Sequence, residues 1–184
     1  MITTPPPAGR EALARAVRDT IRDVPDFPKP GIVFKDITPL LSDAALFARV
    51  TNSMAEVAGP MGITHVVAIE SRGFLFGAPV AQRLGVALVP VRKPGKLPHR
   101  SVREDYALEY GSDALEMHED ALRAGARVLV VDDVLATGGT AVATRRLVEK
   151  VGGIVVAYAF LIDLTFLHGP QVLMGSSVDA IVEY

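Results

Sequence analysis

Residues 128–140 read VLVVDDVLATGGT, followed by AVATRRLV at 141–148. Four apolar residues predict a buried strand, two adjacent carboxylates stand at its end, and the second segment predicts a helix. A strand that passes through Thr-Gly-Gly-Thr into a helix is typical of a phosphate site, because glycine lets the backbone approach an anion and the free N–H groups of a helix start attract it. Neighbouring carboxylates are costly to bury unless partners such as sugar hydroxyls take them up. The stretch therefore predicts a ligand with both a phosphate and a sugar, and we call residues 136–140 the phosphate cradle.

The same stretch lacks the spacing of two common nucleotide-binding motifs. It contains neither Gly-x-x-x-x-Gly-Lys-Ser/Thr nor Gly-x-Gly-x-x-Gly, so it predicts neither a nucleoside-triphosphate loop nor a dinucleotide fold. An ordinary strand-to-helix turn is the alternative, since Gly and Thr are common in turns. The acid pair argues against that alternative, because two buried carboxylates need partners.

Strands and helices alternate along the chain. The patterns predict helices over residues 10–24, from Ser42 or Asp43 to 58, over 74–84 and from 141 to about 151, and strands over 63–69, 86–91, 127–131, 154–162 and, at an edge, 179–183. This order predicts an α/β fold with a mostly parallel twisted sheet and helices on both faces. Ligands bind beyond the carboxyl ends of such strands, so residues 70–73, 92–96 and 132–140 should share one rim. Between them, 92–105 predict a loop, and alternating runs at 106–110 and 114–118 predict a hairpin.

Length and composition limit the class of protein. The chain has 184 residues, 49% of them hydrophobic, which fits a single domain over 1–184 with residues 1–9 as a disordered lead. A net charge of −2 gives no overall attraction to nucleic acid or to an anionic membrane, and no apolar run approaches the roughly 20 residues of a membrane helix. Because there is no cysteine, disulfides and thiolate chemistry are excluded, and a reducing compartment is compatible.

A run of basic residues without any acidic one lies between positions 92 and 103. Its members are Arg92, Lys93, Lys96, Arg100 and Arg103. A solvated loop is the ordinary explanation of such a run. Here it follows a strand on the rim of the phosphate cradle, and a polyanionic ligand needs cations near its distant phosphates, so we expect the run to bind phosphates. No histidine has partners at metal-ligand spacing, and no protein-held transition metal is predicted.

Five segments match motifs of one known family in order and spacing. They are FPKPGIVFKDI at 27–37, ESRGFLFG at 70–77, VRKPGKLP at 91–98, LEYG at 108–111 and DDVLATGGT at 132–140. The last resembles the loop of type I phosphoribosyltransferases that binds phosphoribosyl pyrophosphate (PRPP), which many such enzymes share. The full set resembles the adenine phosphoribosyltransferases, with a purine-contacting segment, a second loop and the two ends of a catalytic flap.

The resemblance implies an enzyme that transfers the 5-phosphoribosyl group from PRPP to adenine, giving AMP and pyrophosphate in purine salvage. It implies the type I fold with a small N-terminal hood and a flexible flap over 92–113. It also implies Mg²⁺ held mainly by PRPP, a homodimer and a cytoplasmic location. The transition state should resemble an oxocarbenium ion, as in glycoside transfer.

For the PRPP half of the site, the resemblance implies roles for three sets of residues. The 5-phosphate would bind the cradle residues Ala136, Thr137, Gly138, Gly139 and Thr140. The ribose hydroxyls would bind Asp132 and Asp133, whose charge also suits a cationic sugar ring. The remaining contacts to PRPP or AMP would come from Ser71, Arg72, Arg92, Lys93, Lys96 and Tyr110.

For the base, the resemblance implies Val33, Phe34 and Lys35. Phe34 can stack on a purine, although a phenylalanine is more often core. Lys35 stands where an arginine is common in the family, and lysine has no planar fork. A carboxylate near N7 of adenine would help proton transfer, a role that the resemblance gives to Glu109, with Glu104 and Asp105 as rivals within five residues.

Two other functions remain compatible with the sequence. One is phosphoribosyl transfer to another base such as xanthine, guanine or orotate. The other is a PRPP-sensing regulator without catalysis, which would need a nucleic-acid-binding element that the chain does not display. Retention of Lys96 and Glu109 favours an enzyme.

Overall fold

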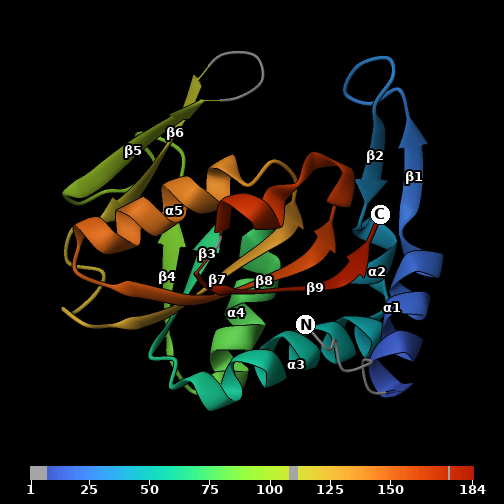
Figure 1. Cartoon of the computed structure of the whole chain (residues 1–184), viewed down its shortest axis with the longest axis horizontal. Coiled ribbons are helices and arrows are strands. Elements are labelled where there is room, and N and C mark those ends of the chain that lie inside the picture. The colour runs from blue at the N-terminus through green and yellow to red at the C-terminus, as the bar shows by residue number, and fades with distance from the viewer. Residues whose placement is uncertain (1–7, 108–111, 174) are drawn as a thin grey trace.

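The computed structural model describes residues 8–107, 112–173 and 175–184. Its centre is a sheet of five strands in the order β4-β3-β7-β8-β9, and every neighbouring pair is parallel. The strands are β3 (His65–Ile69), β4 (Ala87–Val91), β7 (Arg127–Leu135), β8 (Ile154–Asp163) and β9 (Ser177–Glu183). Parallel sheets need cover on both faces, and helices lie on each side of this one (Figure 1), so the predicted fold class is confirmed.

The helices are placed by their apolar faces. α5 (Gly139–Lys150) packs on one face of the sheet, while α3 (Ala44–Ala58) and α4 (Gly73–Leu84) pack on the other, with α1 (Ala8–Thr20) beside β9. The Asp43 side chain accepts a hydrogen bond from the Leu46 N–H at 2.9 Å and caps α3, which selects Asp43 over Ser42 as the predicted cap. Ser42 instead ends a short helix, α2 (Thr38–Ser42), which the apolar spacing did not indicate. Among the described helices, none is both long and apolar enough to cross a membrane.

Two antiparallel hairpins flank the sheet and project past its carboxyl edge (Figure 1). The hood hairpin consists of β1 (Arg22–Pro25) and β2 (Val33–Asp36), and the flap hairpin of β5 (Ser101–Ala107) and β6 (Ser112–His118). Short 3₁₀ turns, η1 (Gly59–Met61), η2 (Thr165–Leu167) and η3 (Gly169–Leu173), complete the described elements. The carboxyl edge of the sheet, its rim, therefore lies between the two hairpins.

Several predicted boundaries were wrong. The first helix ends at Thr20 rather than at residue 24, because Arg22–Pro25 pair with β2. It also begins earlier than predicted, at Ala8, which lies inside the expected disordered lead. Residues 101–105 belong to β5 rather than to a loop, since they pair with β6. The acid pair lies within β7 rather than after it, because β8 continues alongside as far as Leu135. Residues 1–7 of the lead and 108–111 of the flap lie outside the described residues.

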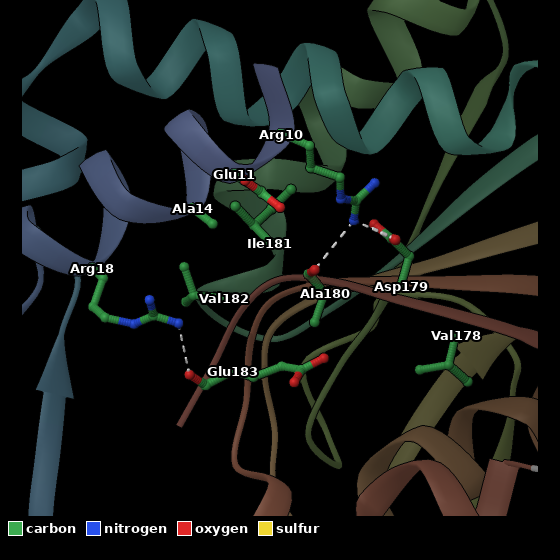
Figure 2. A pocket seen from close by; sticks show the side chains of 10 residues that line it. All are labelled: Arg10, Glu11, Ala14, Arg18, Val178, Asp179, Ala180, Ile181, Val182 and Glu183. Carbon is green, nitrogen blue, oxygen red and sulfur yellow. Dashed lines mark hydrogen bonds and ion pairs between the residues drawn. The ribbon is translucent and has the colours of Figure 1, made fainter. Parts of the chain in front are cut away.

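The outer edge of β9 is covered by two arginines of α1 (Figure 2). Arg10 pairs with the Asp179 carboxylate and donates to the Ala180 carbonyl at 3.2 Å, and Arg18 donates to the Glu183 carbonyl at 3.1 Å. These contacts occupy backbone acceptors on the predicted edge strand, which could otherwise pair with another chain. The helix therefore protects the edge of the sheet at β9.

Candidate active site

The three predicted loops meet at one cavity of about 420 Å³ on the rim. It is lined by residues after β3, after β4, on the flap, at the end of β7 and at the start of α5: Glu70, Ser71, Arg72, Lys93, Tyr106, Asp132, Asp133, Val134, Ala136 and Thr140. The rule that ligands bind at the carboxyl ends of parallel strands thus gathers these side chains correctly.

The phosphate cradle forms a second, smaller cavity of about 60 Å³ where β7 turns into α5. Its walls include all five predicted cradle residues. Gly138 has φ +84°, and a Cβ there would lie 2.4 Å from Val172 Cγ2 and 3.0 Å from the Gly169 carbonyl oxygen. Only glycine fits that conformation and that approach, so the backbone rather than side chains forms this wall beside the start of α5.

The two adjacent carboxylates of β7 differ in environment. Asp133 is 5% exposed, whereas Asp132 is partly exposed. Burial, together with the charge of Asp133, raises the pKa of Asp132 well above its usual value. Burial also raises the pKa of Asp133, although the nearby Arg72 guanidinium acts to lower it. Arg72 Nε lies 2.7 Å from Asp133 Oδ2, yet this buried oxygen accepts no hydrogen bond from the described residues. An acceptor in that state is suited to a ligand hydroxyl.

Gly73 brings the second loop against the acid pair. A Cβ at this position would lie 2.8 Å from Asp132 Oδ1 and 2.9 Å from the Val131 carbonyl oxygen. The loop that carries Ser71 and Arg72 can therefore approach β7 closely only because residue 73 is glycine.

The basic residues after β4 are gathered by a carboxylate that sequence reasoning missed. Glu70 accepts hydrogen bonds from Arg92 Nε at 3.2 Å and from the Lys93 N–H at 2.9 Å, and it pairs with the Lys96 ammonium. Burial acts to raise the pKa of Glu70, but the bonds from Lys96, Lys93 and Arg92 hold it below its usual value. The signal was present as an acidic residue directly after a buried strand and before Ser71.

Lys93 is bound by two residues of the flap hairpin. Its ammonium pairs with the Asp113 carboxylate and lies 3.2 Å from the Tyr106 hydroxyl, which itself lies 3.2 Å from Asp113 Oδ2. Burial acts to lower the pKa of Lys93, but Asp113 and Tyr106 raise it, so the amine stays charged. Tyr106 is a second lining residue that sequence reasoning missed, because it read as one position of a predicted hairpin.

The other two members of the basic run, Arg100 and Arg103, pair with acidic side chains. Arg103 pairs with Asp105 at 2.6 Å, and Arg100 lies 3.9 Å from Glu119. The expectation of phosphate binding therefore finds no support for these two arginines, which lie among acidic side chains of the flap hairpin.

The rivals for the base proton have other partners. Glu104 accepts from Arg146 Nη1 at 3.0 Å and pairs with Lys150 Nζ at 2.6 Å, so these two cations of α5 lower its pKa. Asp105 is bound by Arg103, which lowers its pKa. Glu104 thus anchors the flap hairpin to α5. Glu109 and Tyr110 lie outside the described residues.

The predicted base residues lie on both faces of β2. Val33 and Lys35 line a large cavity of about 1010 Å³ between the hood and the end of the sheet, together with Leu164, Phe166 and Tyr184 among others. Phe34 points to the opposite face and is partly exposed, so the alternative that it is core is wrong.

Arg72 connects Phe34, which the resemblance assigns to the base, with the acid pair of β7. The Phe34 ring centroid lies 5.1 Å from that of Phe27 and 5.0 Å from the Arg72 guanidinium, which contacts Asp133 on its other side. The Arg72 guanidinium therefore connects the Phe34 ring to the Asp133 carboxylate.

A small cavity at residues 136–140, an acid pair with one buried carboxylate and a cationic loop lie on one rim of a parallel sheet, as the resemblance to the phosphoribosyltransferases implies. The family model described as phosphoribosyl transferase domain matches residues 41–165. The curated adenine phosphoribosyltransferase of Myxococcus xanthus is 60% identical over 164 residues, which are 89% of each chain.

Solved structures narrow the class further. The crystal structure of adenine phosphoribosyltransferase from Thermoanaerobacter pseudethanolicus has a TM-score of 0.90 at 50% identity and covers 93% of this chain and 99% of its own. The Saccharomyces cerevisiae enzyme, solved with adenine and an imino-altritol bisphosphate, has a TM-score of 0.87 at 37% identity, covering 93% and 99%. The chain belongs to the adenine phosphoribosyltransferase family, and the predicted family is confirmed.

Proposed function

We propose that this protein transfers the 5-phosphoribosyl group of PRPP to N9 of adenine, giving AMP and pyrophosphate, with the rim residues in the roles given below. The observation that carries the proposal is the buried Asp133 carboxylate between the phosphate cradle and the Arg72 loop, whose Oδ2 is ion-paired with Arg72 Nε at 2.7 Å but accepts no hydrogen bond from the described residues. A ligand that satisfies it must bring a hydroxyl to a point flanked by an anion site on one side and cations on the other. PRPP has its ribose hydroxyls between two phosphorylated ends.

The donor half of the site binds by position and charge. Ala136, Thr137, Gly138, Gly139 and Thr140 hold the 5-phosphate through backbone N–H groups and hydroxyls at the start of α5. Asp132 and Asp133 hold the ribose hydroxyls. Their negative charge stabilises the cationic sugar ring that develops as the bond from C1 to pyrophosphate lengthens.

The leaving pyrophosphate faces the cationic loops. Arg72, Arg92, Lys93 and Lys96 bind it, and Arg92 and Lys96 exchange their bonds to Glu70 for bonds to phosphate oxygens. Ser71 and Tyr110 make further contacts to PRPP or AMP. No three His, Asp or Glu residues of the described chain are grouped as metal ligands. The partly exposed Asp132 would fit beside a Mg²⁺ held mainly by the substrate phosphates and water, and such an ion would neutralise pyrophosphate charge.

The acceptor half of the site lies on β2. Phe34 stacks on the adenine ring, the backbone of Val33 pairs with the base edge, and Lys35 lies on the other face of the same strand. Glu109 handles the base proton near N7, because the rival carboxylates of Glu104 and Asp105 are bound to cations.

We further propose one domain over residues 1–184, a cytoplasmic location and a homodimer. The absence of cysteine is compatible with a reducing compartment. Leu88 on the edge strand β4 and Leu75 on the neighbouring α4 are 42% and 44% exposed, and such apolar side chains at a sheet edge suit a subunit contact.

Turnover with each base in turn tests the reaction. The protein is incubated with PRPP, Mg²⁺ and adenine, hypoxanthine, guanine, xanthine or orotate, and pyrophosphate release is measured. Adenine should be used fastest and should yield AMP. Faster release with hypoxanthine or guanine would overturn the choice of base, and PRPP binding without release with any base would overturn catalysis.

A further inference from the structure

Tyr184, directly after β9, is firmly attached to the core. Its N–H donates to the Asp163 carbonyl at 2.9 Å, and its carbonyl accepts from the Thr165 N–H at 3.0 Å and from Thr165 Oγ1 at 2.8 Å. Its ring is partly buried against the apolar cluster under α1 and α3. Tyr184 therefore moves with the sheet and with the turn that follows β8.

The Lys35 ammonium, which belongs to the hood, lies over the face of the Tyr184 ring. Lys35 Nζ lies 3.8 Å from the ring centroid, and the Lys35 side chain is only 15% exposed. The same ammonium pairs with Asp23 Oδ1 at 2.7 Å, and Asp23 lies opposite Lys35 in the hood hairpin. One lysine thus connects both hood strands to a ring that belongs to the core.

The hood hairpin projects from the core beside this end of β9 (Figure 1), and the large cavity lies between them. Lys35 and Tyr184 both line that cavity, so their contact forms part of its wall and joins the hood to the core. Because Phe34 follows Val33 and precedes Lys35 on one short strand, a change in the Lys35 contact displaces the residues that face the base.

We propose that Tyr184 is a positioning residue for the base. The Lys35 ammonium, paired with Asp23, packs on the Tyr184 ring and so holds β2 in place. This contact sets the distance between the base-binding strand and the rim of the sheet. The inference rests on the proposed assignment of the base to β2. It also gives Lys35 a role that does not need the planar fork of an arginine, because a compact ammonium over a ring is sufficient.

The Tyr184 hydroxyl is not required for this role. Burial, followed by the charge of Asp23, raises the pKa of Tyr184, so the ring stays neutral at physiological pH. A phenylalanine presents the same kind of face to the ammonium.

Steady-state kinetics of Tyr184→Ala, with Tyr184→Phe as the matched control, test the proposal. Loss of a partly desolvated cation–π contact should raise the KM for adenine by about tenfold in Tyr184→Ala and leave the KM for PRPP within about twofold. Tyr184→Phe should retain both values. Lys35→Met should behave like Tyr184→Ala, and the double variant should be no worse than the more impaired single variant, because both remove one contact.

Three results would overturn the proposal: an unchanged KM for adenine in Tyr184→Ala, an equal rise in both KM values, or additive effects in the double variant. If Tyr184→Ala does not fold, as judged by thermal unfolding, Lys35→Met and Asp23→Asn test the same contact while the Tyr184 ring stays in place, and unchanged adenine KM values in both would overturn the proposal. Failure of the wild-type protein to use adenine would instead refute the proposed function.

Discussion

The phosphate cradle and the base site are built in opposite ways. The cradle and its acid pair come from one continuous stretch, residues 132–140, on a single strand and the start of one helix. The proposed base site lies on β2, and the opposite face of this strand lines a cavity shared with the turn after β8 and the residue after β9, which are far apart in the chain. A local motif can fix a phosphate by backbone geometry alone, whereas the position of a base depends on how two parts of the fold are held together. The two halves should therefore fail in different ways.

The largest expected effect follows from removing the charge of the acid pair. Asp132→Asn combined with Asp133→Asn keeps the shape of β7 but removes the groups proposed to hold the ribose and to stabilise its developing charge. We expect kcat to fall by about a thousandfold or more, on the scale of lost electrostatic stabilisation of a transition state. Circular dichroism should confirm that the fold survives. Turnover within tenfold of wild type would contradict the ribose role.

A somewhat smaller effect is expected at the close approach of the second loop. Gly73→Ala places a Cβ 2.8 Å from Asp132 Oδ1, so the Arg72 loop must move away from β7. We expect kcat/KM for PRPP to fall by about a hundredfold, since misplacement near 1 Å has that effect on positioned groups. Gly59→Ala is the matched control, because a Cβ there meets nothing within 4 Å. Equal activity of the two variants would show that this approach is not needed.

The sequence allowed the cradle to be predicted almost completely and the base site only in part. Glycine and hydroxyl residues at a strand-to-helix turn have a local physical meaning, and all five residues predicted for the cradle line one small cavity. Tyr184 and Glu70 were missed because their contacts are to residues at distant positions, Lys35 and Lys96.

The boundary errors have the same origin. Residues 22–24 continue the helical spacing of the first helix, but pairing with β2 overrides it. Residues 101–105 read as a polar loop because Glu104 separates Val102 and Tyr106 on the inward face of the strand, so period-two alternation is weak in the sequence although burial alternates along the strand.

The smallest effect should appear where the flap hairpin meets α5. Glu104→Gln removes the ion pairs to Arg146 and Lys150, and we expect a loss of about 1 kcal/mol in the free energy of unfolding at pH 7. Because these cations lower the pKa of Glu104 in the folded state, its contribution exists above the unfolded pKa of about 4.3 and disappears as the pH falls through the lowered value. Urea unfolding at pH 7 and at pH 3 measures this. A difference between variant and wild type that is as large at pH 3 would contradict the ion-pair explanation.

Binding of ribose 5-phosphate and of AMP to Phe34→Ala separates the two halves most directly. Titration calorimetry on the variant and the wild type gives the Kd of each ligand. Stacking of a base on an aromatic ring is worth about 1–3 kcal/mol, so AMP should bind roughly 5- to 150-fold more weakly to the variant. Ribose 5-phosphate should bind with an unchanged Kd, because it needs only the cradle and the acid pair. An equal loss of affinity for both ligands, or none for AMP, would contradict a base site on β2 that is separate from the cradle.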